Sequence, residues 1–155
     1  AQGWVDLMDE LGWEPLRNRH LLLERGGDTL VVAGVDDVTA ESSGLAGHRA
    51  HLTGALDGAD PDLPVLLLAH QPKFVDRAAA AGVDLQLSGH THGGQIWPTG
   101  LVAKLFRYNE LNYGMKQITP ACAAIVSGGT GTWGYKIRTE GKTELVMVEI
   151  EQKNA

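Results

Sequence analysis

Three histidines, His70, His90 and His92, stand in a pattern that could bind metal ions. Imidazole is a good ligand for zinc, manganese and iron. In the run Gly89-His90-Thr91-His92 the glycine permits a sharp turn, and the one-residue gap lets the two rings point toward different ions. Two ions about 3.5–4 Å apart form the clamp with which many phosphatases and nucleases hold a phosphoryl group. The sequence therefore predicts that these three histidines are metal ligands.

Each part of this histidine set follows an apolar run that is typical of a buried strand. Residues 65–69 are continuously apolar before His70, and residues 83–87 alternate before the His90 pair. Between them, residues 72–82 begin with proline and end with glycine, as a helix would. Open α/β sheets bind ligands beyond the carboxyl ends of their strands. The histidines are therefore expected at the edge of a sheet where binding sites usually form.

The rest of the chain predicts a single continuous α/β unit without repeats or linkers. A helix is expected at residues 3–11, a β-hairpin with strands at 21–23 and 30–35, a loop at 38–47 and a helix at 48–56. Residues 95–119 show no clear periodicity and are expected to form a loop. Strands are expected at residues 123–127, 135–138 and 143–150.

Composition narrows the function classes. The chain has 155 residues, of which 43% are hydrophobic, enough for one domain with a core. Its net charge of −6 and lack of basic runs argue against a nucleic-acid surface. Cys122 is the only cysteine, so a disulfide within the chain is excluded, and the thiol is expected to be buried and inert. No apolar stretch is long enough to span a membrane, so the sequence as given predicts a soluble chain.

The histidine motifs resemble those of the calcineurin-like metallophosphoesterases. Residues 70–72 read HQP, and residues 89–98 read GHTHGGQIWP, which is similar to the bacterial type of this family. The closing residues 129–134, GTGTWG, followed by Ile137 and Arg138, also resemble the last strands of that subfamily. The resemblance extends over nearly the whole chain, and the histidine motifs are its most specific part.

The resemblance implies an αββα sandwich, of which residues 1–155 would be the C-terminal portion of a single domain. It implies that His70 and His90 bind one divalent ion and His92 a second, the metal being manganese, zinc or iron. The family's Asp-x-His pair, bridging aspartate and Asn-His dyad are not found in this sequence. In family order these motifs come first, so Ala1 is expected to lie shortly after the Asn-His motif, and the N-terminal metal-binding half is expected to be absent.

For the intact enzyme, the resemblance implies hydrolysis of phosphate mono- or diesters, with two ions activating water and neutralising the charge on the phosphoryl oxygens. The fragment itself is expected to be inactive and to supply no catalytic residue beyond its metal ligands. It is expected to need the missing half or a swapped protomer, because an apolar sheet face would otherwise be exposed. Members of the subfamily often carry an N-terminal membrane helix, so the parent is expected to be cytoplasmic or membrane-associated.

Two other functions stay open at this point. The chain could be a non-catalytic metal-binding or assembly module that is complete as given, or its parent could be a phosphodiesterase or nuclease instead of a monoesterase. Residues 129–134 also match the G-x-G-x-x-G dinucleotide pattern. Strands, not a helix, are expected after them, so no helix N-terminus would meet a pyrophosphate. A structural turn is the favoured interpretation of these glycines.

Several further residues have both a functional and a structural interpretation. Asp36 and Asp37 could contact substrate or metal, although a carboxylate pair after a strand more often caps a turn. Trp97 and Trp133 could line a pocket, although core packing is the more ordinary role of tryptophan. The remaining histidines lack such context and are expected at the surface: His20, His48 and His51.

Overall fold

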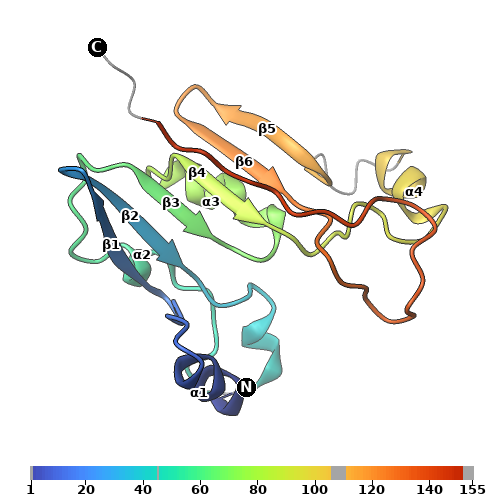
Figure 1. Cartoon of the computed structure of the whole chain (residues 1–155), viewed down its shortest axis with the longest axis horizontal. Coiled ribbons are helices and arrows are strands. Elements are labelled where there is room, and N and C mark those ends of the chain that lie inside the picture. The colour runs from blue at the N-terminus through green and yellow to red at the C-terminus, as the bar shows by residue number, and fades with distance from the viewer. Residues whose placement is uncertain (1, 45, 106–110, 152–155) are drawn as a thin grey trace.

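Six strands of the described residues form one mixed sheet in the order β1-β2-β3-β4-β6-β5 (Figure 1). The computed structural model describes residues 2–44, 46–105 and 111–151. Its strands are β1 (Arg19–Arg25), β2 (Asp28–Gly34), β3 (Val65–Leu68), β4 (Leu85–Ser88), β5 (Gly114–Thr119) and β6 (Cys122–Val126). The four inner strands run parallel, and β1 and β5 run antiparallel to their neighbours at the two edges. The expected α/β fold is confirmed.

Short helices connect the strands. They are α1 (Gln2–Glu10), η1 (Ala40–Ser43), α2 (Leu52–Ala55), η2 (Pro72–Phe74), α3 (Val75–Ala80) and α4 (Thr99–Leu105). Pro72 stands in the first turn of η2, and Gly82, with φ +82°, ends the helical stretch as its sequence position predicts. The helix expected at residues 48–56 is shorter than predicted. None of the helices in the part of the chain that the structure describes is long and apolar enough to cross a membrane.

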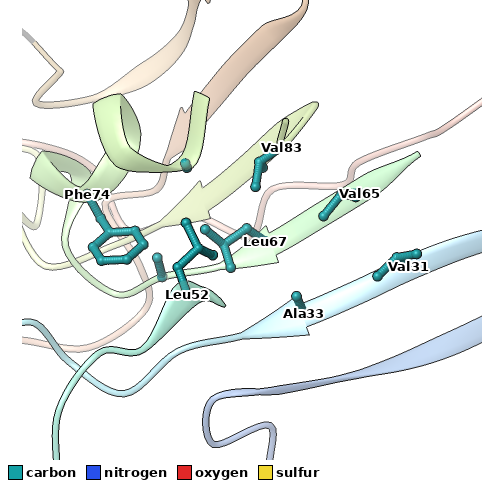
Figure 2. Packing of buried hydrophobic residues seen from close by; sticks show 9 residues of the cluster. Val31, Ala33, Leu52, Val65, Leu67, Phe74 and Val83 are labelled. Atoms are coloured by element: carbon teal, nitrogen blue, oxygen red, sulfur yellow. The ribbon is translucent and has the colours of Figure 1, made fainter. Parts of the chain in front are cut away.

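One face of the sheet carries the main hydrophobic core (Figure 2). Val31 of β2 and Leu67 of β3 are fully buried there, under Leu52 of α2 and Phe74 of η2. β3 is a central strand whose Val65 and Leu67 are buried on this face, while Leu66 and Leu68 on the other face are half-buried and exposed. A smaller cluster joins Val75 of α3 to β6. These contacts fix the positions of β3 and β4, whose ends carry the histidines.

The opposite face is also apolar but less covered. The register aligns Leu68, Leu87 and Ile125 in one row across β3, β4 and β6. Leu68 remains 41% exposed. The C-terminal segment runs along this face (Figure 1), where Val146 and Leu87 line a pocket of about 280 Å³. The apolar surface that the sequence led us to expect is therefore present on this side of the sheet.

The strands expected at residues 135–138 and 143–150 are wrong, because no strand is assigned in either range. Alternation does position Val146 and Val148 against the sheet. However, a strand needs a neighbour for its backbone hydrogen bonds, and among the described residues this segment pairs with none of the six strands. Leu145 and Met147, in the opposite row, are 89% and 93% exposed. The alternation of residues 143–150 is that of a strand, but the segment has no neighbouring strand among the described residues with which to pair.

The loop expected at residues 95–119 is only partly correct. It contains α4 and the edge strand β5, which the sequence did not reveal. β5 shows no apolar alternation because neither of its faces is buried: all of its residues are exposed or half-buried. Residues 106–110 of the expected loop lie outside the described residues.

Candidate metal centre

The ends of β3 and β4 bring His70 and His90 together. Because the two strands are parallel neighbours, the residues that follow them leave the same edge of the sheet. The Gly89 backbone N–H donates a hydrogen bond to the His70 carbonyl oxygen at 3.1 Å, which joins the two loops. The two imidazole rings meet edge to face, with 5.1 Å between their centroids and 82° between their planes. Both histidines are exposed, so a metal ion could reach them from solvent.

The turn after β4 holds both of its histidines in a strained backbone conformation. His90 has φ +69° and His92 has φ +52°, in the left-handed region that non-glycine residues rarely occupy. Each such residue costs about 1–3 kcal/mol, so the surroundings must stabilise the turn. One stabilising contact is the hydroxyl of Thr91, which donates to the Asn112 carbonyl oxygen at 2.7 Å. Strain of this kind is concentrated at functional sites.

His92 presents a ring nitrogen that lacks a hydrogen-bond partner. Its Nδ1 atom is buried and makes no hydrogen bond to any of the described residues. A buried polar atom without a partner is costly unless something else satisfies it, and a metal ion is one such partner for an imidazole nitrogen. His92 lies close enough to His90 for its charge to affect the pKa of that ring. The observation fits the predicted role of His92 as a ligand.

The electrostatic surroundings favour the metal-binding form of His90. Burial lowers the pKa of His90, and the positive charges of His70 and Lys73 lower it further, while Asp37 acts in the opposite direction. A lower pKa keeps the imidazole neutral at physiological pH. Metal ions bind the neutral ring, because its nitrogen lone pair is then available.

The ligand set is nevertheless incomplete within the described part of the chain. There, no three His, Cys, Asp or Glu side chains come close enough to hold one metal ion. A structural or catalytic metal usually has at least three protein ligands. The donor chemistry of His70, His90 and His92 therefore fits divalent ions, and further ligands are needed to complete a centre.

Asp37 lies at the margin of the histidine pair. Its Oδ1 atom accepts hydrogen bonds from the Thr39 backbone N–H and from Gln71 Nε2, both at 2.7 Å. The first contact is the turn cap that the sequence favoured. Burial would raise the pKa of Asp37, but hydrogen bonds from the Thr39 hydroxyl, the Thr39 backbone N–H and Gln71, together with the charge of His70, outweigh it and lower the pKa. Asp36 instead forms a two-point ion pair with Arg17, at 3.0 and 2.7 Å.

Gln95 is a structural residue whose role the sequence did not reveal. It is only 6% exposed, and its amide joins the histidine turn to the segment after β6. Its Nε2 atom donates to the carbonyl oxygens of Trp133 at 2.8 Å and Ile137 at 3.0 Å. Its Oε1 atom accepts from the Trp133 N–H at 2.7 Å. The pairing spans some forty positions of sequence, and no local pattern predicts such a contact.

Two charged residues also fasten the segment after β6. Arg138 donates to the carbonyl oxygens of His92 at 2.8 Å and Gly128 at 3.1 Å. Glu144 accepts from the Gly128 N–H at 2.9 Å and from the Tyr113 hydroxyl at 2.6 Å. The hydrogen bond from Tyr113 and that from Gly128 lower the pKa of Glu144. Both side chains therefore hold the residues behind the histidine turn.

The structure also tests the sequence interpretations of the tryptophans, the cysteine, the glycine-rich residues 129–134 and the other histidines. Core packing of Trp97 and Trp133 is wrong, since they are 67% and 76% exposed. Cys122 is buried as expected, and burial raises the pKa of its thiol. No helix follows residues 129–134 within the described part of the chain, so the dinucleotide pattern lacks the element that would bind pyrophosphate. His20, His48 and His51 are half-buried or exposed.

Comparison with curated proteins places this geometry in context. Over 98% of its length the chain is 33% identical to a transmembrane protein with metallophosphoesterase domain from Danio rerio, and over 97% it is 35% identical to the protein of that name from Bos taurus. An uncharacterized metallophosphoesterase from Aquifex aeolicus is 34% identical over 96% of the chain. The chain spans 36%, 35% and 55% of these relatives. No family model and no solved structure matches it.

Proposed function

This chain belongs to the metallophosphoesterase family, and we propose that the whole protein hydrolyses phosphate mono- or diesters at a two-metal centre. The observation that carries the proposal is the meeting of His70 and His90 at the carboxyl ends of adjacent parallel strands, 5.1 Å apart between ring centroids. The strained turn that presents His90 and His92 supports it, because such strain persists only where the surroundings enforce it.

The histidines are assigned separate roles. In this proposal His70 and His90 would hold one ion, and His92, whose buried Nδ1 has no hydrogen-bond partner among the described residues, would hold the other. When bound, the two ions lower the pKa of the attacking water and neutralise the charge that develops on the phosphoryl oxygens. The chain's own part is to hold the imidazoles in place, and the lowered pKa of His90 keeps that ring neutral and able to bind. A net charge of −6 is compatible with a phosphate substrate, because the ions supply the positive field.

The other ligands are proposed to come from N-terminal residues of the whole protein. Two observations support this: three potential ligands do not converge within the described residues, and the chain spans only about a third of its relatives from Danio rerio and Bos taurus. The isolated chain is then inactive, and its apolar sheet face needs the N-terminal half or a swapped protomer. Sedimentation of the isolated chain tests this point, since a stable, fully soluble monomer would contradict it.

Hydrolysis assays test the proposal directly. We expect the whole protein to cleave p-nitrophenyl phosphate or its bis-ester only with added Mn²⁺, Zn²⁺ or Fe²⁺, and a chelator to abolish the reaction. His90→Ala should abolish it too, whereas His48→Ala, a change outside the site, should leave the rate unchanged. Metal-independent hydrolysis, or full activity of His90→Ala, would contradict the proposal. Comparison of the two substrates decides between monoesterase and diesterase.

A non-catalytic metal-binding module is the second candidate. The incomplete ligand set among the described residues favours it over hydrolysis, because His70 and His90 alone would hold at most one ion, whereas the proposed reaction requires two. This candidate predicts metal binding by the whole protein without phosphoester hydrolysis under any of the metals tested.

Membrane attachment of the whole protein is also part of the proposal. The relatives from Danio rerio and Bos taurus are named as transmembrane proteins. Fractionation of cells that express the whole protein tests the point: recovery in the membrane pellet is expected, and complete recovery in the soluble fraction would contradict it.

A further inference from the structure

We propose that Arg138 is a positioning residue that holds His92 in its metal-binding conformation. The inference rests on the proposed function of His92 as a ligand. The starting observation is that the Arg138 guanidinium donates to the His92 carbonyl oxygen at 2.8 Å through Nη1, across 46 positions of sequence. Its Nη2 atom donates to the carbonyl oxygens of Gly128 at 3.1 Å and Gly131 at 2.5 Å.

The hydrogen bond to the His92 carbonyl oxygen matters because it helps to hold His92 in a left-handed backbone conformation. His92 has φ +52°, and a non-glycine residue relaxes from this region unless its peptide groups are held. Arg138 fixes the orientation of the peptide group that follows the His92 Cα atom. A hydrogen bond from a charged donor is stronger than one between neutral groups, so this contact suits the task.

The same carbonyl oxygen is also closely approached by the backbone at Gly141. A Cβ atom at Gly141 would lie 3.0 Å from the His92 carbonyl oxygen and 3.1 Å from that of Gly93. The His92 carbonyl oxygen therefore has both Gly141 and the Arg138 guanidinium close to it, and a side chain at position 141 would crowd it.

The chemistry of arginine explains why this residue type is used. Its planar guanidinium presents donors in a fixed fork and can serve three carbonyl oxygens at once, whereas lysine presents a flexible point charge. Within the described residues Arg138 forms no ion pair, so its donors are directed to these carbonyl groups. Glu144 lies near enough for the Arg138 charge to lower the pKa of its carboxyl group, which balances the charge locally.

Mn²⁺ titration of the whole protein, followed by the electron paramagnetic resonance signal of free Mn²⁺, tests the inference. Arg138→Gln should weaken binding of one of the two ions about 10- to 100-fold, the usual effect of removing an outer partner of a ligand. Arg138→Lys should recover part of the loss. Arg25→Gln, which removes the same charge from an exposed position on β1, should bind both ions like wild type.

The double variant with His92→Ala separates positioning from general damage. If Arg138 acts through His92, then Arg138→Gln added to His92→Ala causes no further loss of Mn²⁺ affinity, because both changes remove the same contribution. Unchanged affinity in Arg138→Gln, or a full further loss in the double variant, would overturn the inference while leaving the proposed function intact.

A metal-free measurement keeps the two proposals distinguishable. Amide hydrogen exchange of residues 90–95 should be faster in Arg138→Gln than in Arg25→Gln. If wild type binds none of Mn²⁺, Zn²⁺ and Fe²⁺, the proposed function fails, and equal exchange in the two variants would then show that Arg138 does not hold this turn either.

Discussion

Replacement of Gly94 by alanine tests whether the turn after His92 needs glycine for space as well as for backbone conformation. Gly94 has φ +82°, and a Cβ atom there would lie 2.7 Å from Gly100 Cα and 3.0 Å from Gly100 N. Gly82, at the end of α3, also has φ +82°, but a Cβ atom there would meet nothing within 4 Å. The two glycines therefore share a conformational cost and differ in a steric one.

The expected losses follow from these two contributions. A left-handed conformation costs an alanine about 1–2 kcal/mol relative to glycine, and this applies at both positions. At Gly94 the new methyl group would also have to displace the backbone of α4, and overpacking of this kind adds about 1–3 kcal/mol. We expect Gly82→Ala to lower the free energy of unfolding by about 1–2 kcal/mol and Gly94→Ala by about 2–5 kcal/mol.

Urea denaturation of both variants, followed by tryptophan fluorescence, measures the difference. If the two substitutions lower the free energy of unfolding equally, the close approach of Gly94 to Gly100 carries no cost and the reasoning is refuted. If Gly82→Ala causes the larger loss, the packing of the histidine turn against α4 is wrong.

Two further predictions concern the segment after β6. Gln95→Leu should lower the free energy of unfolding by about 1.5–4.5 kcal/mol, since the amide supplies three or more hydrogen bonds of about 0.5–1.5 kcal/mol each. Gln95→Leu should also reduce metal affinity. Gln117→Leu, a control remote from the histidine turn, should leave metal affinity unchanged. Glu144 has a lowered pKa, chiefly through the hydrogen bond from Tyr113, so its contribution to stability is present above its ordinary pKa of 4.5 and is lost as the pH falls through its folded pKa. The stability difference between wild type and Glu144→Gln should therefore shrink on acidification in urea titrations, and a difference that is independent of pH would contradict the assignment.

Local sequence patterns were sufficient for the central strands and for the position of the histidines. The continuous apolar run before His70 correctly predicted a central strand, although only one face of β3 is buried and Leu68 on the other face is 41% exposed. Once β3 and β4 are parallel neighbours, the meeting of His70 and His90 follows from geometry. The histidine motifs also predicted membership of the metallophosphoesterase family, and the comparison with known proteins confirms it.

Features that depend on a distant partner could not be predicted. The alternation of Val146 and Val148 is that of a strand, yet strand formation also requires a neighbour that the described residues do not provide. Gln95 and Arg138 form hydrogen bonds to residues some forty positions away, and no local sequence pattern predicts such contacts. Core packing was the more ordinary interpretation of Trp133, but this residue is 76% exposed, because its surroundings in the fold and not its residue type decide its exposure.

The metal content of the whole protein, measured by elemental mass spectrometry, tests the central claim most directly. About two divalent ions per chain are expected for wild type, and the removal of either His70 or His92 by alanine substitution should cost one of them. His20→Ala, a histidine outside the site, should retain both. Wild-type metal content in the His70→Ala and His92→Ala variants, or no metal in the wild-type protein, would contradict the claim that these histidines are ligands of a two-metal centre.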